Sequence, residues 1–201
     1  MPSSQNIKGA TGPVVLAFGD SLTAGYGLRA GECFGSRLET LLRRHHPGAS
    51  VIRAGVSGET TAGGCARLPR VLSQLDRQPD LAIVELGAND FIRRVDPAVT
   101  EANLDWMIGE LQRCGIPVLL AGMRVPAILG PLAARFNALF PAVAGRQGAA
   151  LYPFFLDGVA GRRGLVLADG IHPNAAAIEE VACRILPHVE AALDAGARVA
   201  A

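Results

Sequence analysis

Ser21 lies in the stretch FGDSLTAGYG, directly after an aspartate and among three glycines. A serine hydroxyl is a weak nucleophile until a base removes its proton, and the base needs a third group to fix its tautomer. Asp169 and His172, in DGIHPN, are spaced so that the carboxylate can hold one ring nitrogen and direct the other at the serine. These three residues would support acyl transfer. Each also has a purely structural interpretation: a tight turn, a helix cap and a surface histidine.

Acyl transfer also needs hydrogen-bond donors for a developing oxyanion, each typically worth about 10²–10³ in rate. Gly58, in GVSGETT, offers a backbone amide that no side chain obstructs, and Asn89, in ELGANDF, offers a side-chain amide. The backbone amide of Ser21 completes a set of three. Singly, a glycine and an asparagine in loops are ordinary turn residues. Their joint placement with the serine and the Asp-His pair favours the catalytic interpretation.

Short apolar runs alternate with segments of helical periodicity, a pattern typical of a parallel sheet covered on both faces. The predicted strands are residues 14–18, 51–54, 81–86, 118–122 and 149–154. The predicted helices are about 33–45, 61–74, 97–114, 129–147 and 173–195, with Pro97 and Pro173 in first turns. Right-handed crossovers favour an α/β fold, a three-layer αβα sandwich with a five-stranded parallel flavodoxin-like sheet of strand order 2-1-3-4-5. All four candidate loops then meet at the carboxyl edge, where such sheets bind ligands.

The 201 residues are half hydrophobic, which predicts one domain at 13–195 after a polar extension at 1–12. A net charge of +1 gives no field to attract nucleic acid, and no apolar run is long enough for stable membrane insertion. The start lacks the apolar centre of a signal peptide, which predicts a cytoplasmic protein as the chain is given, or a periplasmic one if a signal was removed. The oligomeric state stays open. The dispersed cysteines are expected to be small buried residues rather than zinc ligands or disulfides: Cys33, Cys65, Cys114 and Cys183.

Other nucleotide-binding and catalytic motifs are incomplete. The G-x-S-x-G elbow fails because Thr23 occupies its last position, and no G-x-x-x-x-G-K-[ST] phosphate loop occurs. The dinucleotide pattern that begins at Gly25 lacks its third glycine, since that position is Ala30. A non-catalytic flavodoxin-like module, which would hold an anion with the backbone amides of FGDSLTAGYG, remains an alternative from a different class.

The four blocks together resemble the SGNH hydrolases, also called GDSL esterases, and within them the bacterial arylesterase, thioesterase I and lysophospholipase L1 branch. ARLPRVL, MRVP, ARFN and YPFFL are also similar to that branch, so the resemblance covers about 13–195. It implies a flavodoxin-like fold with Ser21 as nucleophile, His172 as base and Asp169 as its orienting group. It further implies Ser21, Gly58 and Asn89 as oxyanion donors, with no metal and no cofactor.

The expected activity is hydrolysis of small-molecule carboxylic esters, and of thioesters, through an acyl-enzyme. A carbohydrate acetylesterase on the same scaffold is the alternative. Residues beside the reacting edge are candidates for contact with the substrate, although the apolar ones could equally cap the core. These candidates are Asp20, Leu22, Asp90, Phe91, Ile92, Val125, Ile128 and Leu129. The chain departs from the branch at Ile128-Leu129 and Gly87-Ala88, within the expected pocket walls, and these differences concern the substrate rather than the reaction.

Overall fold

Five parallel strands form one sheet in the order β2-β1-β3-β4-β5, as predicted. The computed structural model describes residues 12–199, and side chains up to 197, so nearly all of the predicted N-terminal extension lies outside the described residues. β1, β3 and β4 are buried along their whole length, which is why their sequences read as continuous apolar runs. The strands are β1 Val14–Gly19, β2 Ser50–Gly55, β3 Leu81–Glu85, β4 Val118–Ala121 and β5 Ala150–Tyr152.

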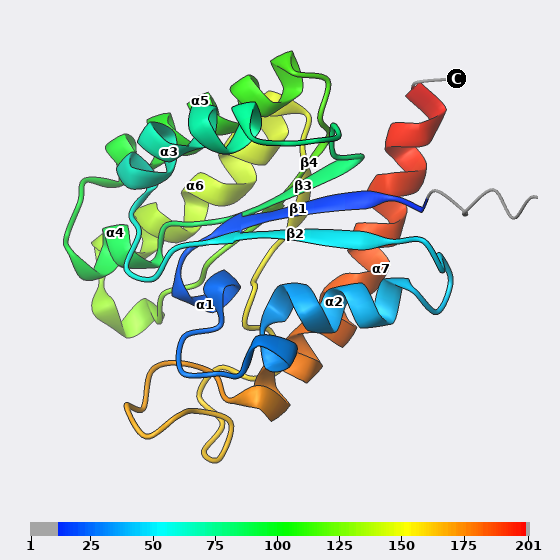
Figure 1. Cartoon of the computed structure of the whole chain (residues 1–201). Helices are drawn as coiled ribbons and strands as arrows, with labels where there is room; N and C mark the ends of the chain where they lie inside the picture. The colour runs from blue at the N-terminus through cyan, green and yellow to red at the C-terminus, as the bar shows by residue number, and fades with distance from the viewer. Residues whose placement is uncertain (1–11, 200–201) are drawn as a thin grey trace, which may run out of the picture.

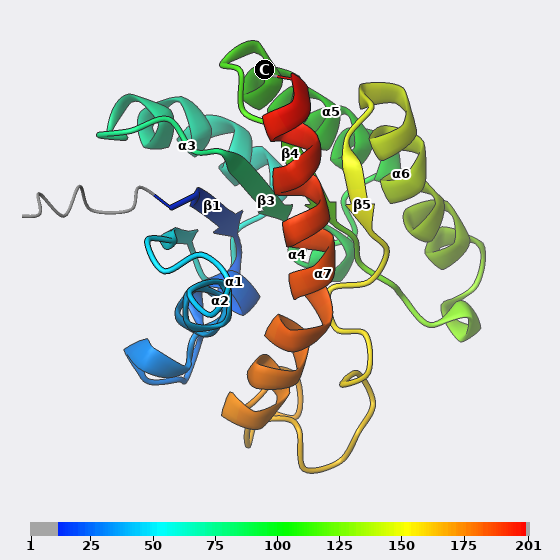
Figure 2. The ribbon, with the colours of Figure 1, turned by 90° about the vertical axis from the view of Figure 1, so that its right-hand side faces the viewer.

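Helices cover both faces of the sheet and complete the predicted three layers (Figure 1). On one face lie α3 Thr61–Ser73, α5 Pro97–Arg113 and α6 Pro131–Gln147; on the other lie α2 Phe34–Leu42 and α7 Ala175–Val199. Two short helices, α1 Ser21–Ala24 and α4 Ala88–Ile92, follow β1 and β3 directly at the carboxyl edge. The 3-10 turns are η1 Ala30–Glu32 and η2 Ala127–Leu129. Figure 2 shows α7 running between α2 on one side and β5 on the other, and α7 packs against α2.

Helix starts follow the capping residues. Pro97 occupies the first turn of α5, after Asp96, whose carboxylate accepts from the backbone N–H of Ala98 at 3.0 Å. Pro173 was predicted in the first turn of α7, and this prediction is wrong. The side chain of Asn174 accepts from the backbone N–H of Ala177 at 3.0 Å and caps α7, so Pro173 lies before the helix.

Two further predictions need correction. α6 begins at Pro131 rather than 129, because Gly130 adopts a φ of 81° and separates it from η2. The cysteines are free, but only Cys33 is buried; Cys183 lies on the exposed face of α7, where helical periodicity places it opposite the core. Among the described residues, no helix has the length and apolar character needed to cross a membrane.

Candidate active site

Ser21 lies where the first strand of the chain ends. The carboxylate of Asp20 accepts a hydrogen bond from the backbone N–H of Leu22 at 3.0 Å and so caps α1. Gly19 permits the close approach of this turn, because a Cβ there would lie 2.3 Å from the hydroxyl of Thr23. Ser21 is therefore the first residue of α1, with 9% of its surface exposed.

The segment between β5 and α7 carries the other two candidates, Asp169 and His172. The N–H of Leu167 donates to the carbonyl of His172 at 2.7 Å, and the N–H of Asn174 donates to that of Leu165 at 3.0 Å. These bonds fold residues 165–174 into a hairpin at the end of the molecule where α1 lies (Figure 1). The hairpin, rather than the sheet itself, determines where the histidine points.

Asp169 is fixed by bonds within this hairpin. Its Oδ1 accepts from the backbone N–H groups of Ile171 at 2.9 Å and His172 at 3.0 Å. Its Oδ2 is 2.7 Å from Nδ1 of His172. The two backbone donors, followed by the imidazole, lower the pKa of Asp169 to about 2. The carboxylate is therefore ionised throughout the neutral range, although it is exposed.

A continuous chain of hydrogen bonds joins the three residues. Nε2 of His172 lies 3.0 Å from Oγ of Ser21. With the proton on Nδ1 and donated to Asp169, Nε2 is free to accept the hydroxyl proton of the serine. The ring of Tyr26 packs on the imidazole at a centroid distance of 4.4 Å and restricts its rotation. This geometry suits a nucleophile and its base.

Two backbone amides near the serine have the properties of oxyanion donors. Within residues 12–199, the N–H groups of Ser21 and Gly58 donate no hydrogen bond. Gly58 has a φ of 78°, a conformation that favours glycine, and its carbonyl accepts from Nη2 of Arg93 at 2.8 Å. Arg93, which directly follows α4, thus connects that helix to the Gly58 loop.

Asn89 is engaged differently. It lies in α4, next to the N-terminus of that helix, where Gly87 adopts a φ of 125°. Its Nδ2 donates one hydrogen to Oδ2 of Asp20 at 2.8 Å and the other to the carbonyl of Glu59 at 3.1 Å. Both amide hydrogens therefore have partners inside the protein. Donation to an oxyanion would require one of these bonds to be shared or released.

Four of the residues predicted to contact substrate are buried in the fold, and three of these are hydrogen-bonded to other segments. Asp20 has 1% of its surface exposed, as has Asp90, whose carboxylate accepts from the backbone N–H of Thr61 at 2.8 Å. Val125 is also buried, and its N–H and carbonyl are bonded to the side chain of Asn137. These three positions follow strand ends, as the sequence indicates. The two carboxylates turn inward toward donors there, and Val125 is held through its backbone groups.

The remaining pocket candidates divide by position. Leu22 is buried beside Ser21, and Phe91 is half-buried against another aromatic ring, Phe136, at a centroid distance of 5.3 Å. The exposed candidates are Ile92 at 67%, Leu129 at 55% and Ile128 at 93%. Figure 2 shows the lime-green turn η2, which carries the last two, at the outer edge of the molecule, across the sheet from α1. Ile92 is thus the best placed of the exposed candidates.

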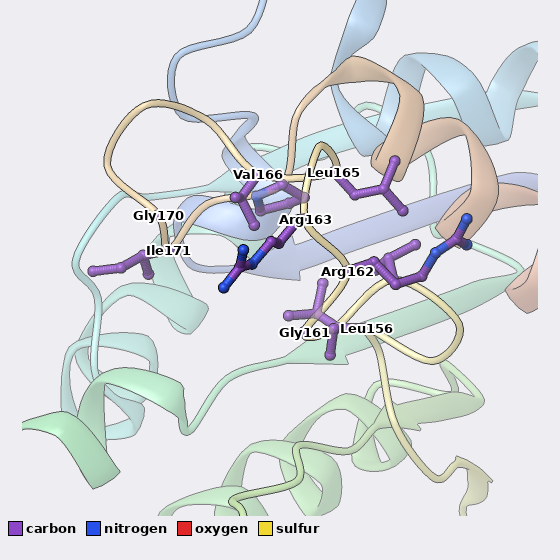
Figure 3. Close-up of a pocket in the computed structure, with 11 residues that line it drawn as sticks. Leu156, Gly161, Arg162, Arg163, Leu165, Val166, Gly170 and Ile171 are labelled. Carbon is purple, nitrogen blue, oxygen red and sulfur yellow. The ribbon is translucent and has the colours of Figure 1, made fainter.

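A pocket of about 300 Å³ lies between the segment after β5 and the hairpin of residues 165–174 (Figure 3). Part of its wall comes from the glycine-rich segment that leads to the hairpin. Most of its lining is apolar, and two arginine side chains border it. The residues that define it best are Leu156, Leu165, Val166, Ile171, Arg162 and Arg163. Because Ile171 directly precedes the histidine, the pocket adjoins the hairpin that carries His172.

Sequence reasoning also missed Tyr26, Thr23 and Glu85, which contact or underlie the triad. Glu85 could have been noticed as an acidic residue at the end of an otherwise apolar strand. Across the described part of the chain, no cluster of three or more His, Cys, Asp or Glu residues is arranged to hold a metal ion.

The αβα sandwich and the Ser-His-Asp arrangement at its carboxyl edge define a serine hydrolase. The chain belongs to the GDSL-like Lipase/Acylhydrolase family, whose model matches residues 17–178. The resemblance seen in the four sequence blocks is thereby confirmed.

Similar proteins specify the class of reaction. The chain is 39% identical to "Esterase TesA" of Pseudomonas aeruginosa, over 84% of this chain and 83% of that protein. It is 34% identical to "Thioesterase 1/protease 1/lysophospholipase L1" of Escherichia coli K12, over 83% and 78%. The crystal structure of AlinE4, an SGNH-hydrolase family esterase, superposes with a TM-score of 0.76 at 47% identity, covering 90% of this chain and 97% of that one. The protein is an ester-cleaving serine hydrolase.

Proposed function

We propose that Ser21 is the nucleophile of this hydrolase, that His172 is its general base and that Asp169 orients the histidine. The observation that carries the proposal is the chain of hydrogen bonds from Oγ of Ser21 to Nε2 of His172, 3.0 Å, and from Nδ1 to Oδ2 of Asp169, 2.7 Å. As the hydroxyl attacks the acyl carbonyl, its proton passes to Nε2. The same nitrogen then protonates the departing alcohol or thiol, and water hydrolyses the acyl-enzyme by the reverse sequence.

The developing oxyanion would lie between α1, the Gly58 loop and α4. The free backbone amides of Ser21 and Gly58 support this placement, since preorganised donors are worth most where charge develops. Asn89 would be the third donor, with one of its hydrogens shared between its protein acceptor and the oxyanion. We expect its contribution to depend on how those acceptors hold it.

The substrates we infer are small acyl esters and thioesters with uncharged acyl groups. Apolar side chains exposed at this edge, Tyr26, Ile92 and Ile171, favour an apolar acyl chain or leaving group over a strongly anionic one. The printed names of the relatives include both esterase and thioesterase. Cytoplasmic or periplasmic action stays a prediction, which fractionation of cells expressing the native gene would test.

The nucleophile is tested by labelling with a fluorophosphonate and by turnover of p-nitrophenyl esters and acyl thioesters of graded length. Ser21→Ala should abolish labelling and lower kcat by roughly 10⁴- to 10⁶-fold, because no other group then forms the acyl-enzyme. Ser73→Ala, at an exposed serine in α3, is the matched control and should behave as wild type. Retention of labelling by Ser21→Ala would refute the assignment. Faster cleavage of acetylated sugars than of longer acyl esters would favour the acetylesterase alternative.

A further inference from the structure

Glu85 is a buried acidic residue that the proposed mechanism does not use. It is the last residue of β3 and has no exposed surface. Its Oε2 accepts from the hydroxyl of Thr23 at 2.7 Å, and Thr23 belongs to the same short helix as Ser21. Its Oε1 has no hydrogen-bond partner among the described residues. An apolar side chain would fill this site with less desolvation, so the acidic group calls for an explanation.

Asp20 is the second buried carboxyl group of this region. It precedes Ser21 in the chain and accepts from the N–H of Leu22 at 3.0 Å and from Nδ2 of Asn89 at 2.8 Å. Asp20 thus joins the turn that carries Ser21 to α4, while Glu85 joins the same turn to β3 through Thr23. The two links connect the segment of Ser21 with β3 and with α4, the helix that carries Asn89.

The surroundings of the two groups decide which of them carries charge. Within the described chain, no arginine bonds to either carboxyl group. Burial raises the pKa of Glu85 well above its usual range, and the neighbouring Asp20 adds to the effect. Burial also raises the pKa of Asp20, to about 6, although the N–H of Leu22, Asn89 and the charge of His172 act in the opposite direction, while that of Glu59 adds to the rise. Asp20 has two hydrogen-bond donors and a pKa of about 6, which favours the carboxylate at neutral pH, whereas Glu85 has one donor and its burial favours the protonated form.

An ionised Asp20 determines which way the amide of Asn89 faces. A carboxylate only accepts hydrogen bonds, so it attracts the NH₂ group of the amide and repels its oxygen. The second hydrogen of Asn89 goes to the carbonyl of Glu59, which is also an acceptor. Both contacts therefore select the same orientation, in which the donor end of the amide lies toward the segment that carries Ser21.

We propose that Asp20 is a positioning residue that holds Asn89 as an oxyanion donor. This inference rests on the proposed function, because it requires an oxyanion beside Ser21. Asp20 acts through Asn89 and touches no substrate.

A double-mutant cycle between Asp20 and Asn89 tests the proposal. Asparagine caps helices as well as aspartate does, so Asp20→Asn should keep α1 while removing the charge that orients the amide. Asp20→Asn and Asn89→Ala should each lower kcat for a p-nitrophenyl ester by about 10²-fold, with KM within about two-fold of wild type. The double variant should be no slower than Asn89→Ala alone, because both changes remove one donor. Effects that multiply would overturn the proposal.

Two further variants keep the result interpretable. Glu85→Gln keeps an acceptor for the hydroxyl of Thr23 and leaves both partners of Asn89 in place, so kcat should stay within about two-fold of wild type. A loss as large as that of Asp20→Asn would overturn the proposal, because the effect would then not run through Asn89. Asp76→Asn, at an exposed carboxylate, is the matched control. If Asp20→Asn does not fold, as judged by circular dichroism, the cycle is run with Asp20→Ser, which also caps helices. If Ser21→Ala is inactive and the effects of Asp20→Asn and Asn89→Ala multiply, only this inference is refuted. If Ser21→Ala is active, the proposed function itself is refuted.

Discussion

Ser21 and His172 reach one another from two regions that hold their residues by different means. The turn that carries Ser21 follows a buried strand. It is held by Asp20 and Glu85, two carboxyl groups almost without contact with solvent. The hairpin that carries His172 is exposed on one side, and Asp169 is held by backbone N–H groups of its own loop. One region relies on burial, and the other relies on local hydrogen bonds.

This difference separates stability from activity. A polar group in the buried layer is poorly solvated, so changes there should alter the free energy of unfolding and its dependence on pH. A polar group in the hairpin is solvated in both the folded and the unfolded chain. Changes in the hairpin should therefore affect turnover and leave the fold nearly untouched.

Among the changes that compare these two regions, Asp169→Asn in the hairpin should have the largest effect. An amide at this position no longer favours the tautomer of His172 with the proton on Nδ1, so Nε2 is less available as a base. We expect kcat for a p-nitrophenyl ester to fall by about 10²- to 10⁴-fold, with a melting temperature close to that of wild type. Asp157→Asn, at another exposed carboxylate, is the matched control and should keep its activity.

The low pKa of Asp169 sets the pH range in which this difference should be seen. Because it lies at about 2 in the folded protein, below the ordinary value of 3.8, the carboxylate stays ionised from pH 4 to 8. The contribution to stability that goes with this shift is present above pH 4 and is lost as the pH falls toward 2, and solvent screening of the exposed carboxylate keeps it small. A melting temperature of Asp169→Asn well below that of wild type at pH 7 would contradict the view that the hairpin serves turnover rather than stability.

Glu85→Gln should show the opposite behaviour, a change in stability with little change in turnover. The pKa of Glu85 is raised in the folded state, so above about pH 4 the unfolded chain releases this proton while the folded protein keeps it. The stability of the wild type should therefore fall with rising pH, by about 1.4 kcal/mol per pH unit until the folded-state pKa is reached. Glutamine does not ionise, so the advantage of Glu85→Gln should grow as the pH rises above 4, up to the folded-state pKa of Glu85.

Denaturant unfolding at several pH values measures this difference. Glu110→Gln is the matched control, because the guanidinium of Arg113 lowers the pKa of Glu110 and the sign reverses there. Its stability relative to wild type should not increase between pH 4 and 8. If the advantage of Glu85→Gln were independent of pH, the buried carboxyl group would have to be ionised in the folded protein.

The sequence was sufficient for the layers and for the chemistry of the four loops, for related reasons. Buried parallel strands read as continuous apolar runs, and the carboxyl ends of such strands meet at one edge whatever the exact loop conformations. Ser21, Gly58, Asn89, Asp169 and His172 could therefore be assigned to one edge without coordinates. The roles proposed for them follow from the kinds of atoms they offer.

Side-chain direction after a strand end was harder to predict. Asp90 and Asp20 follow strands just as Ser21 does, but they turn inward because Thr61 and Asn89 offer them donors from other segments. Such long-range pairs leave no mark in local periodicity. The same holds for Glu85, whose burial depends on the threonine hydroxyl of a helix that is only four residues long.

The smallest expected effects concern the two apolar residues that flank the site, Ile92 on α4 and Ile171 on the hairpin, both 67% exposed. The leaving group must lie beside His172 to be protonated, which places it toward Ile171, and the acyl chain then extends toward α4, where Ile92 is one helical turn from Asn89. Ile171→Ser should lower kcat/KM for bulky leaving groups by about 3- to 10-fold when the acyl chain is kept constant. Ile92→Ser should lower kcat/KM for long acyl chains by a similar factor when the leaving group is kept constant. Ile128→Ser, on the outlying turn η2, should change either profile less. If the two profiles respond in the reverse order, the substrate binds in the opposite direction, and the pocket beside the hairpin holds the acyl chain.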